Sequence, residues 1–167
     1  VFSDVLQDYK NVTLQLKLMD FDGKVLNKKI VKGEVSANSS TIFHKETYAD
    51  LEVDPAKTLL LMTLKTQQGE VLSEEIFYFC YPKDQELPMA KVSFKTKQSD
   101  GRCEVILSAK QLARDIFIEI PYQGARFSDN FFDLLPGQTK KIVITSNEIK
   151  KGESIEIKIR HLKTIIK

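Results

Sequence analysis

Apolar and polar residues alternate with a period of two along most of this 167-residue chain. Successive side chains of a β-strand point to opposite faces, so this alternation is typical of half-buried strands. A clear example is the run from Val12 to Leu18, in which every second residue is valine or leucine. Nothing in the sequence has the length and 3.6-residue spacing of a substantial amphipathic helix. The pattern therefore predicts an all-β fold.

Turn-forming residues divide the chain into short strands. Asp22-Gly23 and Asp100-Gly101 are strong hairpin signals, because glycine adopts the positive φ that tight turns need. A short connection of one helical turn is expected over residues 110–114. The strands expected between the turns cover residues 12–18, 24–31, 41–47, 59–66, 71–81, 91–97, 103–108, 116–120, 140–146 and 155–160.

The stretch from Pro82 to Pro88 interrupts the strand pattern. Two prolines bracket charged residues there, and proline cannot donate a hydrogen bond to a sheet ladder. We therefore expect two tandem immunoglobulin-like antiparallel β-sandwiches, at residues 1–83 and 90–167, joined by a short linker at residues 84–89. The chain lacks tryptophan, so the packed tryptophan of antibody domains is absent. Sandwiches this small bury a modest fraction of their surface, so we expect them to lean on each other or on another part of a longer protein.

The composition limits the partners. The net charge is only +2, so no global field favours nucleic acid or an anionic membrane as a partner. Apolar runs stay well short of the ~20 residues that span a bilayer. Cys80 and Cys103 are too few for a disulfide scaffold or a zinc site, and we expect buried free thiols. The first residue is valine and no secretory signal pattern is present, so we expect an internal or C-terminal piece of a longer protein.

One segment combines aromatic and aliphatic bulk with short polar turn-formers. It is called the signature segment below. Its Pro-Gly pair predicts a type II turn ahead of the strand at 140–146. The apolar side chains predict a hydrophobic plug that closes one end of a sandwich. The segment consists of Phe127, Ser128, Asp129, Asn130, Phe131, Phe132, Asp133, Leu134, Leu135, Pro136 and Gly137.

The signature segment resembles the C-terminal immunoglobulin-like domain of β-mannosidases of glycoside hydrolase family two. Residues 1–24 are similar to the start of the penultimate sandwich of those enzymes. Phe77-Tyr78-Phe79 and the prolines that follow are similar to its last strand and linker. The resemblance thus covers essentially the whole chain and is most specific in the signature segment.

The resemblance implies a parent enzyme that releases terminal β-linked mannose with retention. In that family the two catalytic glutamates lie on a (β/α)₈ barrel, which needs about 250 residues with alternating helices. Neither the length nor the helices are present here. We therefore expect a non-catalytic accessory region with no catalytic residue and no cofactor. Its partner would be the catalytic barrel of the parent chain, on which some apolar side chains of the signature segment could dock instead of forming the domain's own core. A glycan-degrading parent fits a periplasmic, secreted or lysosomal compartment, but the sequence does not fix one.

The remaining polar motifs favour structural roles. Asn147-Glu148 matches the order of residues at the family's acid/base glutamate, but it lies in a polar loop, where we expect a solvated turn.

Asp129, Asn130 and Asp133 offer oxygen ligands for calcium, but their spacing misses the EF-hand pattern, so caps of local turns are expected instead. His44 and His161 have no cysteine or carboxylate at metal-ligand spacing, and no metal site is expected.

Binding of glycans by the sandwiches themselves is the main alternative. Sugar rings stack on flat exposed aromatic rings, and Tyr9, Tyr48, Tyr78, Tyr81 and Tyr122 are the candidates for such a platform. The chain would then be an independent carbohydrate-binding module. A second alternative is a segment of a surface adhesin built from tandem sandwiches.

Overall fold

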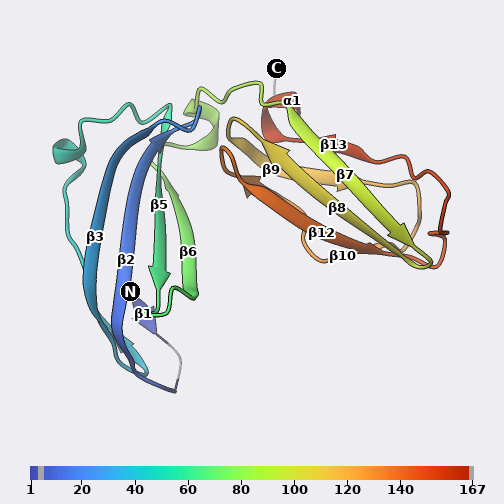
Figure 1. The fold of residues 1–167 in the computed structure, drawn as a ribbon. Coiled ribbons are helices and arrows are strands. Elements are labelled where there is room, and N and C mark those ends of the chain that lie inside the picture. The colour runs from blue at the N-terminus through green and yellow to red at the C-terminus, as the bar shows by residue number, and fades with distance from the viewer. Residues whose placement is uncertain (4–5, 166–167) are drawn as a thin grey trace. The chain divides into compact units, whose positions relative to one another are not determined.

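The computed structural model of the chain describes residues 1–3 and 6–165 (Figure 1). The chain divides into two compact units. Unit 1 comprises Val1–Asp20 and Lys24–Glu86, and unit 2 comprises Phe21–Gly23 and Leu87–Lys167. Strands dominate both units, and all the ladders between the described strands are antiparallel. The prediction of an all-β fold is confirmed.

Unit 1 is built on a four-stranded sheet with the strand order β3-β2-β5-β6, accompanied by a two-stranded ribbon of β1 and β4. The ends of β2, β5 and β6 lie within three residues of the predicted ones, β3 runs four residues further than predicted, and the region after β3 differs. The elements are β1 (Phe2–Ser3), β2 (Tyr9–Asp20), β3 (Val25–Val35), β4 (Ser39–Ser40), the 3₁₀ helix η1 (Tyr48–Leu51), β5 (Thr58–Lys65), β6 (Val71–Tyr78) and the 3₁₀ helix η2 (Pro82–Asp84).

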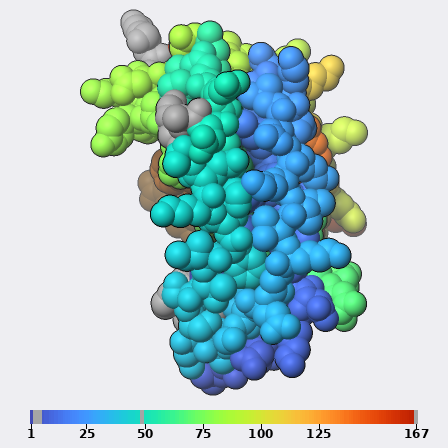
Figure 2. All heavy atoms as spheres, turned by 90° about the vertical axis from the view of Figure 1, so that its left-hand side faces the viewer, coloured from blue at the N-terminus to red at the C-terminus, as the bar shows by residue number. Residues whose placement is uncertain are grey.

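The predicted strand at residues 41–47 is wrong. Backbone pairing ends one residue after β4, where Thr41 donates its N–H to the carbonyl oxygen of Val1 at 2.8 Å. The chain then crosses one face of the sheet instead of extending its edge, and its Phe43 ring lies directly over Gly33 of β3. Figure 2 shows this stretch (cyan to teal) beside β3 (blue). Side-chain packing over the sheet thus replaces the ladder that the alternation suggested.

Unit 2 contains two sheets, with the strand orders β10-β12-β8-β7 and β11-β9-β13. Buried aliphatic side chains from both sheets form one core, including Val105, Ile116, Leu134 and Ile144, all fully buried. Its elements are β7 (Val92–Ser99), β8 (Arg102–Ala109), β9 (Ala113–Glu119), β10 (Arg126–Phe127), β11 (Phe132–Leu134), β12 (Thr139–Thr145), β13 (Lys158–Arg160) and the helix α1 (Leu162–Ile165) (Figure 1).

Two local predictions in unit 2 need correction. The helical turn expected over residues 110–114 is absent, because β9 already begins at Ala113, which pairs with Leu134. Only Lys158–Arg160 of the strand expected over residues 155–160 joins a ladder, because its partner β9 ends at Glu119, opposite Lys158. The alternation itself is kept, since Ile155 and Ile157 still pack against the core. The side-chain period was therefore right, but the length of the ladder depended on the neighbouring strand.

The predicted turns are confirmed. Gly23 and Gly101 both have positive φ, at 94° and 73°. At the Pro-Gly pair, Gln138 donates its N–H to the carbonyl oxygen of Leu135 at 3.0 Å, and Gly137 has a φ of 77°. These are the features of a type II turn.

The prediction of buried thiols is confirmed for one of the two cysteines. Cys103 is buried, whereas Cys80 is half-buried and its thiol donates to the carbonyl oxygen of Pro55 at 3.1 Å. Burial raises the pKa of the Cys103 thiol, so it stays protonated at neutral pH. Within the part of the chain that the structure describes, none of the helices has the length and apolar character that crossing a bilayer requires.

Candidate functional site

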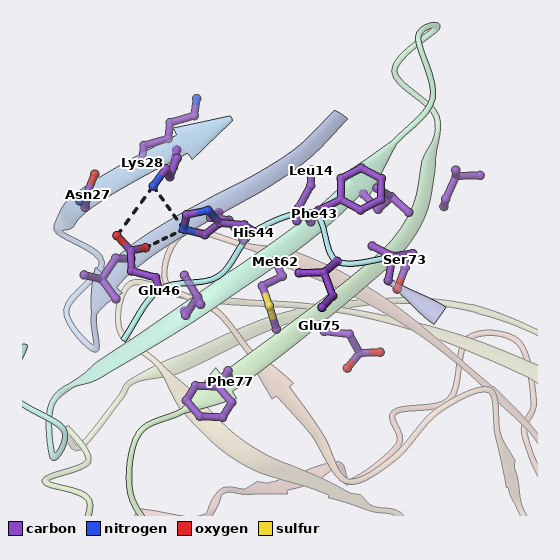
Figure 3. Close-up of a pocket in the computed structure, with 18 of the residues that line it drawn as sticks. Leu14, Asn27, Lys28, Phe43, His44, Glu46, Met62, Ser73, Glu75 and Phe77 are labelled. Atoms are coloured by element: carbon purple, nitrogen blue, oxygen red, sulfur yellow. Dashed lines mark hydrogen bonds and ion pairs between the residues drawn. The ribbon is translucent and has the colours of Figure 1, made fainter. Parts of the chain in front are cut away.

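A groove with a volume of about 1330 Å³ lies over one face of the unit 1 sheet (Figure 3). Residues that pair across the strands form successive rows along its floor. In the middle row Lys29 of β3 is opposite Leu16, Leu16 is opposite Met62, and Met62 is opposite Glu75 of β6. The inner strands therefore contribute aliphatic side chains and the edge strands contribute polar ones. The apolar floor consists of Leu14, Leu16, Leu18, Leu60, Met62 and Leu64.

The segment that crosses the sheet forms one wall of the groove. Phe43 packs against a cluster of Val12, Val35 and Leu64 at one end. Its neighbour Ile42 also lines the groove but is 83% exposed. On the opposite edge, Phe77 of β6 lines the groove and is 51% exposed. The groove therefore presents apolar surface that the chain itself covers only in part.

Three side chains form a polar corner at the β3 edge, namely Lys29, His44 and Glu46. The Nε2 atom of His44 lies 3.2 Å from Lys29 Nζ and 3.0 Å from Glu46 Oε2. A protonated Nε2 donates to Glu46, whereas an unprotonated Nε2 accepts from Lys29. The hydrogen bond with His44, and then the charge of Lys29, lower the pKa of Glu46. The polar corner thus carries an ionised carboxylate and ties the wall segment to β3.

The carboxylates of the groove are not arranged for glycoside hydrolysis. Glu46 is held at the β3 edge by Lys29, whereas Glu75 projects from β6 at the opposite edge. Three strand spacings separate β3 from β6, which puts their backbones about 14 Å apart. A retaining pair needs about 5–5.5 Å between its carboxyl groups. The groove is suited to holding an apolar surface, and its carboxylates are not placed to act as a pair.

The signature segment lies in unit 2 and connects its two sheets. Phe127 pairs with Ile144 in the first sheet, and Phe132 pairs with Ile116 in the second. Phe132, Leu134 and Leu135 are buried, as the core interpretation predicted, whereas Phe127 is half-buried and Phe131 is 68% exposed. The segment is thus a crossover that supplies a short strand to each sheet, and not merely a plug at one end.

The polar residues of the signature segment hold neighbouring strands. Ser128 exchanges hydrogen bonds with Val143, accepting from its N–H at the side-chain Oγ at 2.9 Å. Asp129 pairs with Lys140 at 2.6 Å. Asp133 Oδ1 accepts from the backbone N–H of Asp115 at 2.9 Å.

Asn130 replaces a peptide group in the ladder. Its Oδ1 accepts from Ile118 N–H at 2.9 Å, and its Nδ2 donates to Ile118 O at 3.1 Å. Asp129, Asn130 and Asp133 thus bond mainly to other strands, so the prediction that they cap local turns is wrong in the main. One local bond is present, from the N–H of Phe131 to Asn130 Oδ1 at 3.2 Å. Among the described residues, no group of three or more histidine, cysteine, aspartate or glutamate side chains could hold a metal ion.

Other residues considered from the sequence do not gather into a site. Asn147 and Glu148 lie in an exposed turn, as predicted. Tyr81 is 76% exposed, Tyr78 is half-buried and Tyr122 packs against the core of unit 2. The side chain of Tyr48 lies outside what the structure describes. Tyr9 lines the groove.

The sequence analysis did not predict the groove of unit 1. The one available signal was Gly33 inside a strand, since a glycine there often marks a close approach of another group.

His161 is buried and its Nε2–H donates to the carbonyl oxygen of Ala90 at 3.0 Å. Burial lowers its pKa, although the bond to Ala90 opposes the shift. The unfolded chain therefore binds this proton more readily than the folded chain. We expect the free energy of unfolding of unit 2 to be constant above the ordinary histidine pKa of about 6.5 and to fall as the pH drops below it.

Urea unfolding measured at steps between pH 7.5 and 5.5 checks this expectation. In the variant His161→Gln the amide can still donate to Ala90 but does not titrate, so the decline should flatten. An equal decline in both proteins would show that His161 is not responsible.

Two compact units of antiparallel β-strands define the class, which is that of tandem immunoglobulin-like domains. Residues 1–84 match the family described as "Mannosidase Ig/CBM-like domain", and residues 87–165 match the family described as "Ig-fold domain". The chain belongs to the family of mannosidase immunoglobulin-like domains.

Solved structures of glycosidases share this fold. The β-D-mannosidase from Dictyoglomus thermophilum matches with a TM-score of 0.71 and 23% identity over 95% of this chain and 19% of that one. The exo-chitosanase from Amycolatopsis orientalis matches with a TM-score of 0.59 and 15% identity over 96% of this chain and 24% of that one. The chain thus spans about a fifth to a quarter of the length of these proteins. A comparison with curated proteins finds no match.

Proposed function

We propose that the chain is a non-catalytic accessory region of a β-mannosidase and that it supports the catalytic barrel of the same polypeptide. The parent enzyme would hydrolyse terminal β-D-mannose residues. Membership of the mannosidase immunoglobulin-like family supports this proposal, as does the wide separation of the groove carboxylates Glu46 and Glu75.

The half-open apolar groove of unit 1 is the observation that carries the proposal. Pockets for small ligands commonly have about 300–1000 Å³, and the volume of this groove, about 1330 Å³, exceeds that range. Its floor is aliphatic, and its polar side chains lie at the edge strands. The exposed rings and side chains at its rim, Phe77 and Ile42, fit contact with another protein surface. Such a surface in the parent is the catalytic barrel.

A charge placed on the rim of the groove tests the support role. In the whole enzyme encoded by the parent reading frame, Phe77→Asp is expected to lower the temperature of thermal inactivation by about 2–4 °C, because a carboxylate would be buried at the contact. Val71→Asp is the matched control, since Val71 lies on the same strand and is 52% exposed but does not line the groove. The isolated 167-residue chain should release no p-nitrophenol from p-nitrophenyl β-D-mannopyranoside.

Two results would contradict the proposal. Equal inactivation temperatures for both variants would show that the groove does not contact the barrel. Mannoside turnover by the purified 167-residue chain would show that the region is itself catalytic.

A further inference from the structure

An aromatic side chain in the signature segment is both conformationally strained and exposed. Phe131 has a φ of 62°, in the left-handed region that bulky residues rarely adopt. The residue is 68% exposed, the largest fraction among the exposed large apolar residues described in unit 2. Strain of this kind persists only where the surroundings impose it, and it is concentrated at functional sites.

Hydrogen bonds on both sides impose this conformation. Phe131 donates its backbone N–H to the carbonyl oxygen of Ile116 at 2.9 Å. The preceding Asn130 is held by its paired bonds to Ile118. The backbone at Phe131 is therefore held against β9, and the side chain points away from the core that Phe132 enters next.

The Phe131 ring stacks on Phe117 of β9, with 4.7 Å between ring centroids and 20° between ring planes. Phe117 covers one face of the Phe131 ring. Since most of the Phe131 side chain is exposed, its other face is open to solvent. We call this pair of rings the aromatic platform.

Charged groups lie on the β13 side of the aromatic platform, next to Phe117. Arg160 of β13 is directly opposite Phe117 in the ladder, and its Nη2 lies 3.2 Å from Glu119 Oε2. The Arg160 side chain is 54% exposed, so its guanidinium keeps N–H donors directed to solvent. Arg160 lies across Phe117 from Phe131, because β9 separates β11 from β13. The open face of Phe131 is flat and apolar and matches the apolar C–H face of a pyranose ring.

We propose that the aromatic platform, Phe131 stacked on Phe117, binds a hexopyranose ring of a glycan by stacking on the open face of Phe131. A protein partner fits less well, because two rings offer at most a few hundred Å², whereas a stable protein interface buries about 800 Å² on each partner. The platform lies on unit 2 and does not depend on the groove of unit 1 or on a catalytic barrel. Only the choice of mannose among hexoses rests on the proposed function.

The test titrates the 167-residue chain with β-1,4-mannobiose and with cellobiose while backbone amide signals are recorded. Mannitol serves as the control ligand, because it has the hydroxyls of mannose but no ring face. We expect both disaccharides to bind with affinities on the order of millimolar. The largest shifts should occur at the amides near Phe117, Phe131 and Arg160, and mannitol should cause none of them.

The variant Phe131→Gly separates binding from folding. Glycine adopts positive φ without strain, so this variant should unfold at the same or a higher temperature than the parent chain. Loss of the stacking ring should weaken disaccharide binding by about tenfold. Tyr81→Ala is the matched control, because it removes another exposed aromatic ring and should leave binding unchanged.

Three results would overturn the proposal: unchanged binding in Phe131→Gly, shifts that map away from the platform, or no binding of either disaccharide. If no sugar binds but Phe131→Gly lowers the stability of the whole enzyme, the platform is a protein contact instead. Unequal binding of mannobiose and cellobiose would agree with stacking on Phe131 and would show which hexose the platform prefers.

Discussion

Replacing Asn130 with alanine is expected to lower the free energy of unfolding of unit 2 by about 2–4 kcal/mol. The substitution leaves the N–H and the carbonyl oxygen of Ile118 without their partners. Ile118 is only 1% exposed, so water cannot replace those bonds at little cost. Each buried polar group that loses its partner costs about 1–3 kcal/mol. Urea unfolding followed through the amide signals of unit 2 measures the change.

Two further variants make the Asn130 result specific. Asn130→Asp keeps an acceptor for Ile118 N–H but loses the donor to Ile118 O. Its loss in free energy of unfolding should therefore be no larger than that of Asn130→Ala. Asn147→Ala removes an asparagine from an exposed turn and should change stability by less than about 0.5 kcal/mol. Hydrogen exchange at the Ile118 amide should accelerate in Asn130→Ala. A loss of stability no larger than that of Asn147→Ala would refute the idea that this side chain extends the ladder.

Replacing Gly33 with alanine is expected to destabilise unit 1 by about 1–3 kcal/mol, because it overpacks the end of the groove. A Cβ atom at Gly33 would lie 2.6 Å from Cε1 of Phe43, which is far inside van der Waals contact. The Phe43 ring cannot simply swing away, since it packs against Val12, Val35 and Leu64. Urea unfolding followed through the amide signals of unit 1 measures the loss.

A double-mutant cycle identifies the cause. In a Phe43→Ala background the space above Gly33 is empty, so adding Gly33→Ala should cost nothing, and it could gain about 0.5–1 kcal/mol because alanine loses less conformational freedom on folding. The coupling between the two sites should therefore exceed 1 kcal/mol. If the two changes were additive, the close approach of Phe43 would not explain why glycine is at position 33.

The strands were predictable where one face of a strand is buried. The alternation in 12–18 and 103–108 correctly placed β2 and β8, because the period of two follows directly from strand geometry. The run at 59–66, apolar on both faces at first, correctly placed the central strand β5. The same pattern failed at residues 41–47. There the alternating side chains cover a sheet face, and an alternating sequence does not show whether a neighbouring strand is available for pairing.

The candidate sites were less predictable than the fold. The floor of the groove was visible as an apolar strand face, but its half-open state depends on how far the wall segment covers it. The signature segment was recognised as distinctive, yet its separate roles were not apparent. Phe132 enters the core while the adjacent Phe131 faces solvent with a left-handed φ of 62°. A period of two does not show which of two neighbouring phenylalanines faces the core, and it gives no sign of a left-handed φ.

The sequence by itself determined the fold class, the positions of the glycine turns and the family of the domains. These features follow from local φ preferences and from the burial period of each strand, which act over a few neighbouring residues. Only the tertiary structure decided that Asn130 completes the ladder at Ile118, that Phe43 rests on Gly33, and that Phe131 stacks on Phe117. Each of those contacts joins residues 10 or more positions apart in the printed sequence. Their formation depends on how complete sheets are assembled, which local preferences do not specify.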